Sequence, residues 1–180
     1  MIFTTLAFAA FTAAVNAIEL DSAFYFPPMH FEPLNPAVCT ELDITGFSVI
    51  AQYTVANGGG SGNEYPQNLV KSGTEEWNKW YEASSSRSWV VLHSHVGSVR
   101  VNQISFRSAN DSPARDPGSV TITADGVNLG TFGLSWTERW QWTKVPLGYG
   151  FAASDWRFDF VNGSGINELQ LGQIAFFNGC

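Results

Sequence analysis

Apolar and polar side chains alternate strictly in two short stretches of the chain, residues 120–124 (VTITA) and 156–160 (WRFDF). A period of two places every apolar side chain on the same face of a β-strand. Asp125-Gly126 follows the first stretch directly and is a favourable two-residue hairpin turn, with the chain returning over 127–129. The pattern predicts antiparallel strands with one buried face.

Four further stretches read as strands. Residues 44–56 are rich in β-branched and aromatic side chains and predict the first long strand, and 89–93 (WVVLH) is short and apolar enough for a buried one. Residues 169–177 predict the last strand. In 99–106 the apolar positions change from odd to even, which requires one extra residue, so we expect a β-bulge near Asn102-Gln103.

The composition agrees with an all-β fold. The 180 residues include 17 Gly, 8 Pro, 7 Trp, 5 Tyr and 14 Phe, which favours short strands and many turns over helices. The length suits one globular domain. We therefore predict an antiparallel β-sandwich of the jelly-roll type.

The first residues predict an export signal. Residues 1–17 carry no charged side chain, contain an apolar run and end in small residues, as a secretory signal peptide does, although cleavage after Ala14 is an alternative. Residues 18–38 hold four prolines among aromatics and predict an extended arm, which leaves 39–180 as the domain. We expect a secreted, extracellular protein.

Two cysteines, Cys39 and Cys180, remain after the signal peptide. An even number of cysteines in an oxidising compartment points to a disulfide. The first and last strands of the domain would then meet.

Residues 104–117 (ISFRSANDSPARDP) read as a strand that runs into a polar loop held by its own side chains, with Arg115 and the adjacent Asp116 as a local ion pair. This stretch resembles the discoidin, or F5/8 type C, branch of the galactose-binding-like domains. Two further segments resemble the same family. One begins at Asn68-Leu69 and ends at Lys79-Trp80, and the other comprises residues 169–174 (LQLGQI). The resemblance covers residues 44–177 and implies a galactose-binding-like jelly roll whose two ends are joined by a disulfide.

The resemblance also raises the question of a structural calcium ion. Many relatives hold one with backbone carbonyls and an Asp side chain, but Lys71 or Ser72 stands at that position here. An ammonium group is a poor neighbour for a dication that requires oxygen ligands. Glu75 and Glu76 are the candidate substitutes if calcium binds at all.

The net charge and the absence of catalytic motifs argue against several classes of function. The formal net charge of −7 and the scattered basic residues argue against a nucleic-acid partner, and no later segment is apolar and long enough to span a membrane. The sequence contains neither a Gly-x-Ser-x-Gly nor a His-Glu-x-x-His motif. We therefore do not expect an enzyme.

Aromatic residues in loops are the best candidates for ligand contacts, because sugar rings stack on aromatic faces while polar side chains bind the hydroxyl groups. Trp140 and Trp142 alternate with Gln141 and are expected in the core, whereas Trp136 is expected at a loop tip. The candidate ligand-binding residues are Tyr65, Trp77, Trp136 and Arg139.

Asn162-Gly163-Ser164 is a candidate N-glycosylation sequon. The function that the sequence favours is a secreted binding module that recognises extracellular or cell-surface carbohydrate. The alternative is an adhesion or matrix protein that binds a protein partner through the proline-rich arm. A hydrolase would require a carboxylate pair or a histidine-bound metal in a deep pocket.

Overall fold

The computed structural model describes residues 38–52, 64–71 and 79–180. These residues lie within one compact unit, Asn35–Cys180. None of the helices among these residues has the length and apolar character needed to cross a membrane. The predicted signal peptide lies outside the described residues, as does the predicted arm except for its last residue, Val38. The domain boundary at residue 39 stays a prediction.

The described residues form β-strands joined by loops and two short 3-10 helices, with no α-helix among them. The elements are β1 (Thr40–Leu42), β2 (Ser48–Ala51), η1 (Pro66–Val70), β3 (Trp80–Glu82), β4 (Arg87–His93), β5 (Val99–Arg107), η2 (Pro113–Arg115), β6 (Pro117–Ala124), β7 (Val127–Gly133), β8 (Trp142–Ala153), β9 (Asp155–Asn162), β10 (Leu169–Leu171) and β11 (Gln173–Asn178).

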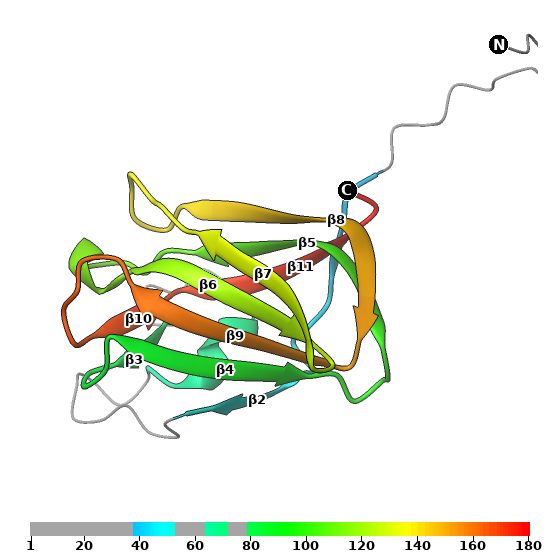
Figure 1. Cartoon of the computed structure of the whole chain (residues 1–180), viewed down its shortest axis with the longest axis horizontal. Coiled ribbons are helices and arrows are strands. Elements are labelled where there is room, and N and C mark those ends of the chain that lie inside the picture. Colours follow the sequence, from blue (N-terminus) through cyan, green and yellow to red (C-terminus); the bar gives the residue numbers. More distant parts are fainter. Residues whose placement is uncertain (1–37, 53–63, 72–78) are drawn as a thin grey trace, which may run out of the picture. The chain divides into compact units, whose positions relative to one another are not determined.

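The strands form two facing antiparallel sheets and one small additional sheet (Figure 1). The four-stranded sheet has the order β1-β11-β5-β8, the five-stranded sheet has the order β2-β4-β9-β6-β7, and β10 pairs with β3. The prediction of an all-β, antiparallel jelly-roll sandwich is confirmed.

The core lies between the two large sheets and follows the alternation seen in the sequence. In β9, Trp156, Phe158 and Phe160 are buried while the residues between them are partly exposed. Phe106 of β5 meets Phe158 edge to face, with 5.6 Å between the ring centres. Edge-to-face contacts add to the stabilisation that area burial already provides. The interleaved aromatic rings therefore fix how the two sheets face each other.

Two local predictions are confirmed. The register of β5 against β8 shifts between Val101 and Gln103, which is the expected bulge. Asp125 and Gly126 form the tight turn between β6 and β7 and have φ values of 44° and 81°. Positive φ at both central residues is the signature of the hairpin turn whose twist matches that of the strands.

Two strand predictions are wrong in their extent. Of the strand predicted over residues 44–56, the described part forms only the short β2, because the chain turns at Thr45 before it: Asp43 Oδ1 accepts hydrogen bonds from the Thr45 amide and hydroxyl at 3.0 and 2.7 Å. Residues 53–56 of the predicted strand lie outside the described residues. The last strand is divided at Gly172. A Cβ atom there would lie 2.6 Å from the Ser108 carbonyl oxygen, so the chain can pass only as glycine.

The two ends of the domain are joined. Cys39 and Cys180 form a disulfide across a sequence separation of 141 residues, and β1 pairs with β11 beside it. A crosslink over so long a loop lowers the entropy of the unfolded chain and adds roughly 4–5 kcal/mol on the chain-entropy model. The predicted pairing of the first and last strands is present.

Candidate functional site

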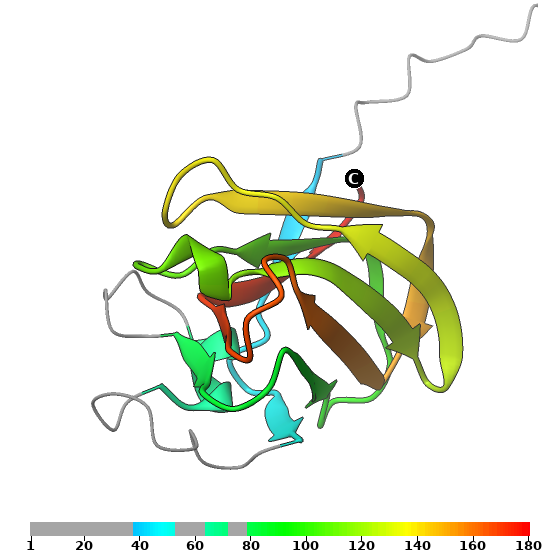
Figure 2. The same cartoon turned by 60° about the vertical axis from the view of Figure 1, so that its left-hand side comes forward.

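Three loops meet at one end of the sandwich, and we call this region the loop end. They are residues 108–116 after β5, residues 134–141 after β7 and residues 163–168 after β9. Figures 1 and 2 show η2 beside the turn that follows β9, with the loop between β7 and β8 above them. The loop end carries two of the sequence-predicted ligand residues.

Ser108 joins the first two loops. It is fully buried, its hydroxyl donates to the Glu138 carbonyl at 3.2 Å, and it accepts from the Gln141 amide at 3.0 Å. Gln141 in turn accepts at its side-chain oxygen from the Thr137 amide at 2.8 Å. These bonds give the loop between β7 and β8 a fixed path, although it has no regular secondary structure.

Close backbone contact joins the start of β6 to the third loop. A Cβ atom on Gly118 would lie 2.6 Å from the Cα of Gly163, so the two segments can approach this closely only without side chains. Asn162 Nδ2 donates to the carbonyls of Ala114 and Glu168, both at 2.8 Å. The end of β9 is thereby tied to η2.

A cleft of about 220 Å³ opens between these loops, and we call it the loop-end cleft. Trp136 forms one wall: it packs against the core and its indole N–H donates to the Phe106 carbonyl at 3.4 Å. The remaining lining residues are Pro113, Asp116, Pro117, Gly118, Leu134, Ser135, Gly163 and Ser164. An indole ring beside a carboxylate and two serines can stack on a sugar ring and hydrogen-bond its hydroxyl groups.

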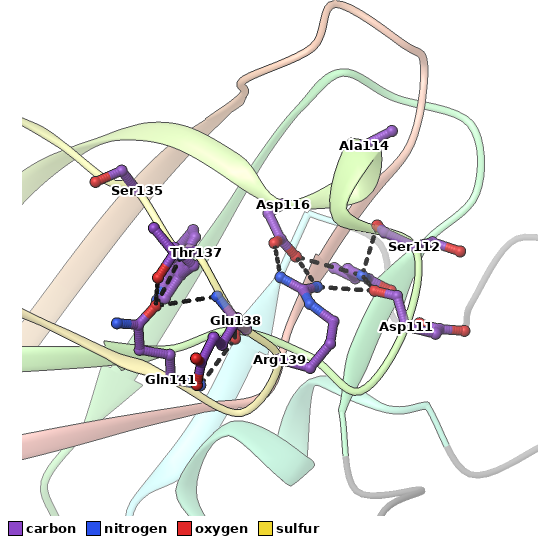
Figure 3. Close-up of polar contacts among 12 residues, drawn as sticks. Asp111, Ser112, Ala114, Asp116, Ser135, Thr137, Glu138, Arg139 and Gln141 are labelled. Carbon is purple, nitrogen blue, oxygen red and sulfur yellow. Dashed lines mark hydrogen bonds and ion pairs between the residues drawn. The ribbon is translucent and has the colours of Figure 1, made fainter.

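Asp116 is the charged group of the cleft. It is 8% exposed and forms an ion pair with Arg139, whose Nη1 donates to Oδ1 at 3.1 Å while Nη2 donates to Oδ2 (Figure 3). Burial raises the pKa of Asp116 to about 6, although Arg139 and a hydrogen bond from Gln170 oppose the shift. The carboxylate is thus held in a bidentate pair whose charge is sensitive to mildly acidic pH.

A second set of charges lies behind the cleft, around Lys79. The residue is 3% exposed, and its ammonium contacts Asp111 Oδ1 at 2.6 Å, Glu64 Oε1 at 3.3 Å and Gln170 Oε1 at 3.3 Å. Arg139 Nη1 also donates to the Asp111 carbonyl at 2.8 Å. The cationic groups here are engaged with oxygens of the fold, which suits a supporting role.

The structure places the four predicted ligand residues differently. Trp136 lines the loop-end cleft. Arg139 is not among the lining residues, but it forms an ion pair with Asp116, which is. Tyr65 is exposed and lies next to Glu64, outside the cleft lining. Trp77 lies outside the described residues, as do the candidate calcium ligands Glu75 and Glu76.

Three sequence-based readings of the tryptophans are wrong in part. Trp136 is half-buried against the core, where a loop tip was expected. Trp142 is 40% exposed, where a core position was expected, and Trp140 is half-buried with a φ of 60°. The Arg107 guanidinium lies 4.5 Å from the Trp140 ring centre, so a stacked cation takes the place of apolar packing.

The expected pair of Arg115 with Asp116 is not formed. Arg115 pairs with Glu168 and lies 3.8 Å from Asp111, while Asp116 pairs with Arg139 of the neighbouring loop. The partners are distant in sequence, which no local pattern shows. Asp116, Ser135 and Ser164 were likewise missed as cleft residues.

Asn162, the predicted glycan acceptor, is 7% exposed. Its amide nitrogen donates to two carbonyls, and its oxygen accepts from the Ser164 and Gly165 amides at 2.7 and 2.6 Å. A glycan would displace at least one of these bonds, so the geometry gives Asn162 a structural role. Glycosylation stays a prediction.

Among the described residues, no group of three or more His, Cys, Asp or Glu side chains is arranged to hold a metal ion. Lys71, which the sequence placed near the family's calcium position, is exposed, and its carbonyl accepts from Gln173 Nε2 at 2.8 Å. The Lys71 carbonyl thus has a partner within the fold.

Comparison with known proteins shows similarity in structure. No protein-family model matches the chain, and no curated protein matches its sequence. An F5/8 type C domain from Bacteroides fragilis matches with a TM-score of 0.65 and 12% identity, covering 80% of this chain and 99% of that one. The family 32 carbohydrate-binding module of Clostridium perfringens NanJ, solved in complex with galactose, matches with a TM-score of 0.62 and 11% identity, covering 78% of this chain and all of that one.

A fucolectin from striped bass (Morone saxatilis) serum matches with a TM-score of 0.59 and 8% identity, covering 77% of this chain and 49% of that one. Structural similarity at such low sequence identity establishes the fold and does not identify the ligand. The resemblance noted in the sequence is confirmed at that level: the structural neighbours of this chain are F5/8 type C domains and family 32 carbohydrate-binding modules.

Proposed function

We propose that the protein is a secreted, non-enzymatic carbohydrate-binding module that holds a sugar residue in the loop-end cleft. The observation that carries the proposal is the placement of the Trp136 ring and the Asp116 carboxylate in one hollow of about 220 Å³. Sugar recognition requires an aromatic face and a fixed hydrogen-bonding group together, and the cleft supplies both.

The Asp116–Arg139 pair supports binding rather than catalysis. Both carboxylate oxygens accept from the guanidinium, which fixes their position and offers their remaining lone pairs to sugar hydroxyl groups. A hydrolase would need a second carboxyl group opposite the first, and Asp116 is the one carboxylate among the described residues that line this cleft. The fold shared with sugar-binding modules agrees with this choice.

The experiment is a glycan array followed by titration of the selected sugar, with the full chain produced through a secretory expression host. Galactose is the first monosaccharide to titrate, because a structural neighbour was solved with it. Each array is run with calcium and again with a chelator, which tests the calcium question independently. We expect selective binding of a neutral glycan.

The matched variants are Ser135→Trp and Ser98→Trp. Ser135 is exposed and lines the cleft, so a tryptophan there would fill the hollow without removing core packing, whereas Ser98 is exposed in the turn at the opposite end of β5. Binding should fall at least about tenfold in the first variant and be unchanged in the second. A blank array from folded protein would favour the alternative of a protein partner.

A further inference from the structure

The outer face of the four-stranded sheet carries a row of three side chains from neighbouring strands. Gln173 of β11 lies opposite Arg107 of β5, and Arg107 lies opposite Trp142 of β8. Residues paired in this way project from the same face of a sheet. Arg107 Nη1 donates to Gln173 Oε1 at 2.9 Å, and its guanidinium lies 5.8 Å from the centre of the Trp142 ring. The row thus supports an exposed indole ring.

A groove of about 390 Å³ lies over β11 beside this ring, and we call it the sheet-face groove. Trp142 lines one side and the chain from Glu41 to Thr45 lines the other. Val70 and Lys71 line it as well, and Gln173 Nε2 holds the Lys71 carbonyl at 2.8 Å. The volume lies within the range of small-molecule sites and exceeds that of the loop-end cleft.

The wall that faces Trp142 is acidic. Glu41 and Asp43 are both exposed there, and β1 ends between them at Leu42. Hydrogen bonds from the side chain and the amide of Thr45 lower the pKa of Asp43, so its carboxylate remains charged at neutral and mildly acidic pH. These bonds occupy Oδ1, and the carboxylate can accept further donors.

We propose that the sheet-face groove is a second sugar-binding site, selective for a hexosamine unit that carries a free ammonium group. The proposal goes beyond the function of the loop-end cleft and needs no residue of that cleft. The exposed face of Trp142 receives the apolar face of the sugar, and Asp43 and Glu41 accept from the ammonium group and a neighbouring hydroxyl.

The charges in the groove determine which residues bind the ammonium group and which bind the sugar ring. Arg107 already stacks near Trp142, so the ring offers little attraction to a second cation, and the ammonium belongs with the carboxylates. Hydrogen bonds between charged groups are about twice as strong as neutral ones, which gives the amine its selectivity. Two carboxylates against Lys71, on a chain with a net charge of −7, disfavour anionic sugars.

The test is calorimetric titration of the full chain with a glucosamine trisaccharide and with its fully N-acetylated counterpart. Acetylation removes the positive charge, so we expect the free amine form to bind about tenfold more tightly at low salt, with the difference shrinking as salt is added. Equal affinity for the two forms, or no binding of either at millimolar concentration, would overturn the proposal.

Variants locate the binding. Trp142→Ala should weaken binding of the amine form at least about tenfold, Trp142→Tyr should retain most of it, and Asp43→Asn should remove the preference over the acetylated form. Lys71→Gln should strengthen binding a few-fold, because it removes a like charge from the groove. Circular dichroism and thermal melting confirm that each variant is folded.

Ser135→Trp separates this proposal from the one for the loop-end cleft. Filling that cleft should leave binding of the glucosamine trisaccharide unchanged, whether or not the cleft itself binds a sugar. If Ser135→Trp abolishes the binding while Trp142→Ala leaves it intact, the amine is bound at the loop end and the sheet-face site is refuted.

Discussion

At the loop end, Lys79 and Arg139 donate to oxygens of the fold itself, whereas in the sheet-face groove Glu41 and Lys71 are exposed beside a tryptophan ring. Both regions combine aromatic and charged side chains, which is why composition alone does not distinguish them. The difference lies in the partners. Charges that are buried and paired hold the loops together, and charges that face solvent can be used by a ligand.

The largest expected effect comes from removing the buried ammonium of the loop end. Lys79→Met should lower the free energy of unfolding by about 3–5 kcal/mol, because Glu64 and Asp111 would lose the cation between them. Lys71→Met, at an exposed position of the sheet-face groove, should change it by less than about 0.5 kcal/mol. Urea unfolding measures both, and equal effects would remove the contrast between the two regions.

Arg139→Ala should have the next largest effect. It leaves the buried carboxylate of Asp116 without its bidentate partner and should cost about 3 kcal/mol at pH 7. The loss should be smaller at pH 5, because Asp116 can then take up a proton and lose its charge. A penalty that does not vary with pH would show that Arg139 acts through packing alone.

The raised pKa of Asp116 predicts that the free energy of unfolding depends on pH. Its pKa is about 6 in the folded protein, above the ordinary aspartate value of 3.8, so the folded state binds the proton more tightly. The stabilisation from this group is fully present below pH 3.8 and is lost as the pH rises through 6, at about 1 kcal/mol per pH unit in between. Asp116→Asn should lack this component when unfolding curves of the two proteins are compared from pH 4 to 7.

The smallest expected effect on stability is that of Trp142→Ala. The ring is 40% exposed and outside the core, so we expect a loss of about 1 kcal/mol or less in thermal or urea unfolding. Trp80→Ala, at a core position that is 2% exposed, should cost about 3–5 kcal/mol and serves as the control. A large loss for Trp142→Ala would mean that the ring serves the fold.

The strands of the sandwich could be predicted because alternation determines burial. Residues 120–124 and 156–160 bury the side chains that the period of two selects, and the bulge after Val101 follows from the change of parity in β5. The same parity test places Trp142 with the exposed Lys144, opposite to the buried Val145. Applied to β8, it would have identified Trp142 as a surface residue.

The sites could be predicted less well, because their geometry depends on contacts between distant segments. Arg139 was selected for its neighbours in sequence, but its partner Asp116 lies in another loop. The sheet-face groove exists because β1 ends at Leu42 while β11 continues, and the sequence predicted one long strand from residue 44 instead. Such sites require the register of strands, which periodicity does not provide.

The bond between Cys39 and Cys180 also has a mechanical consequence. If the protein were held by its N-terminal segment and pulled at its C-terminus, the load would pass directly through the disulfide and bypass the hydrogen bonds between the strands. The sandwich would remain folded under tension until the disulfide was reduced. A glycan bound at either proposed site would then pull on the domain from the side, so the sugar contacts would yield before the covalent tether.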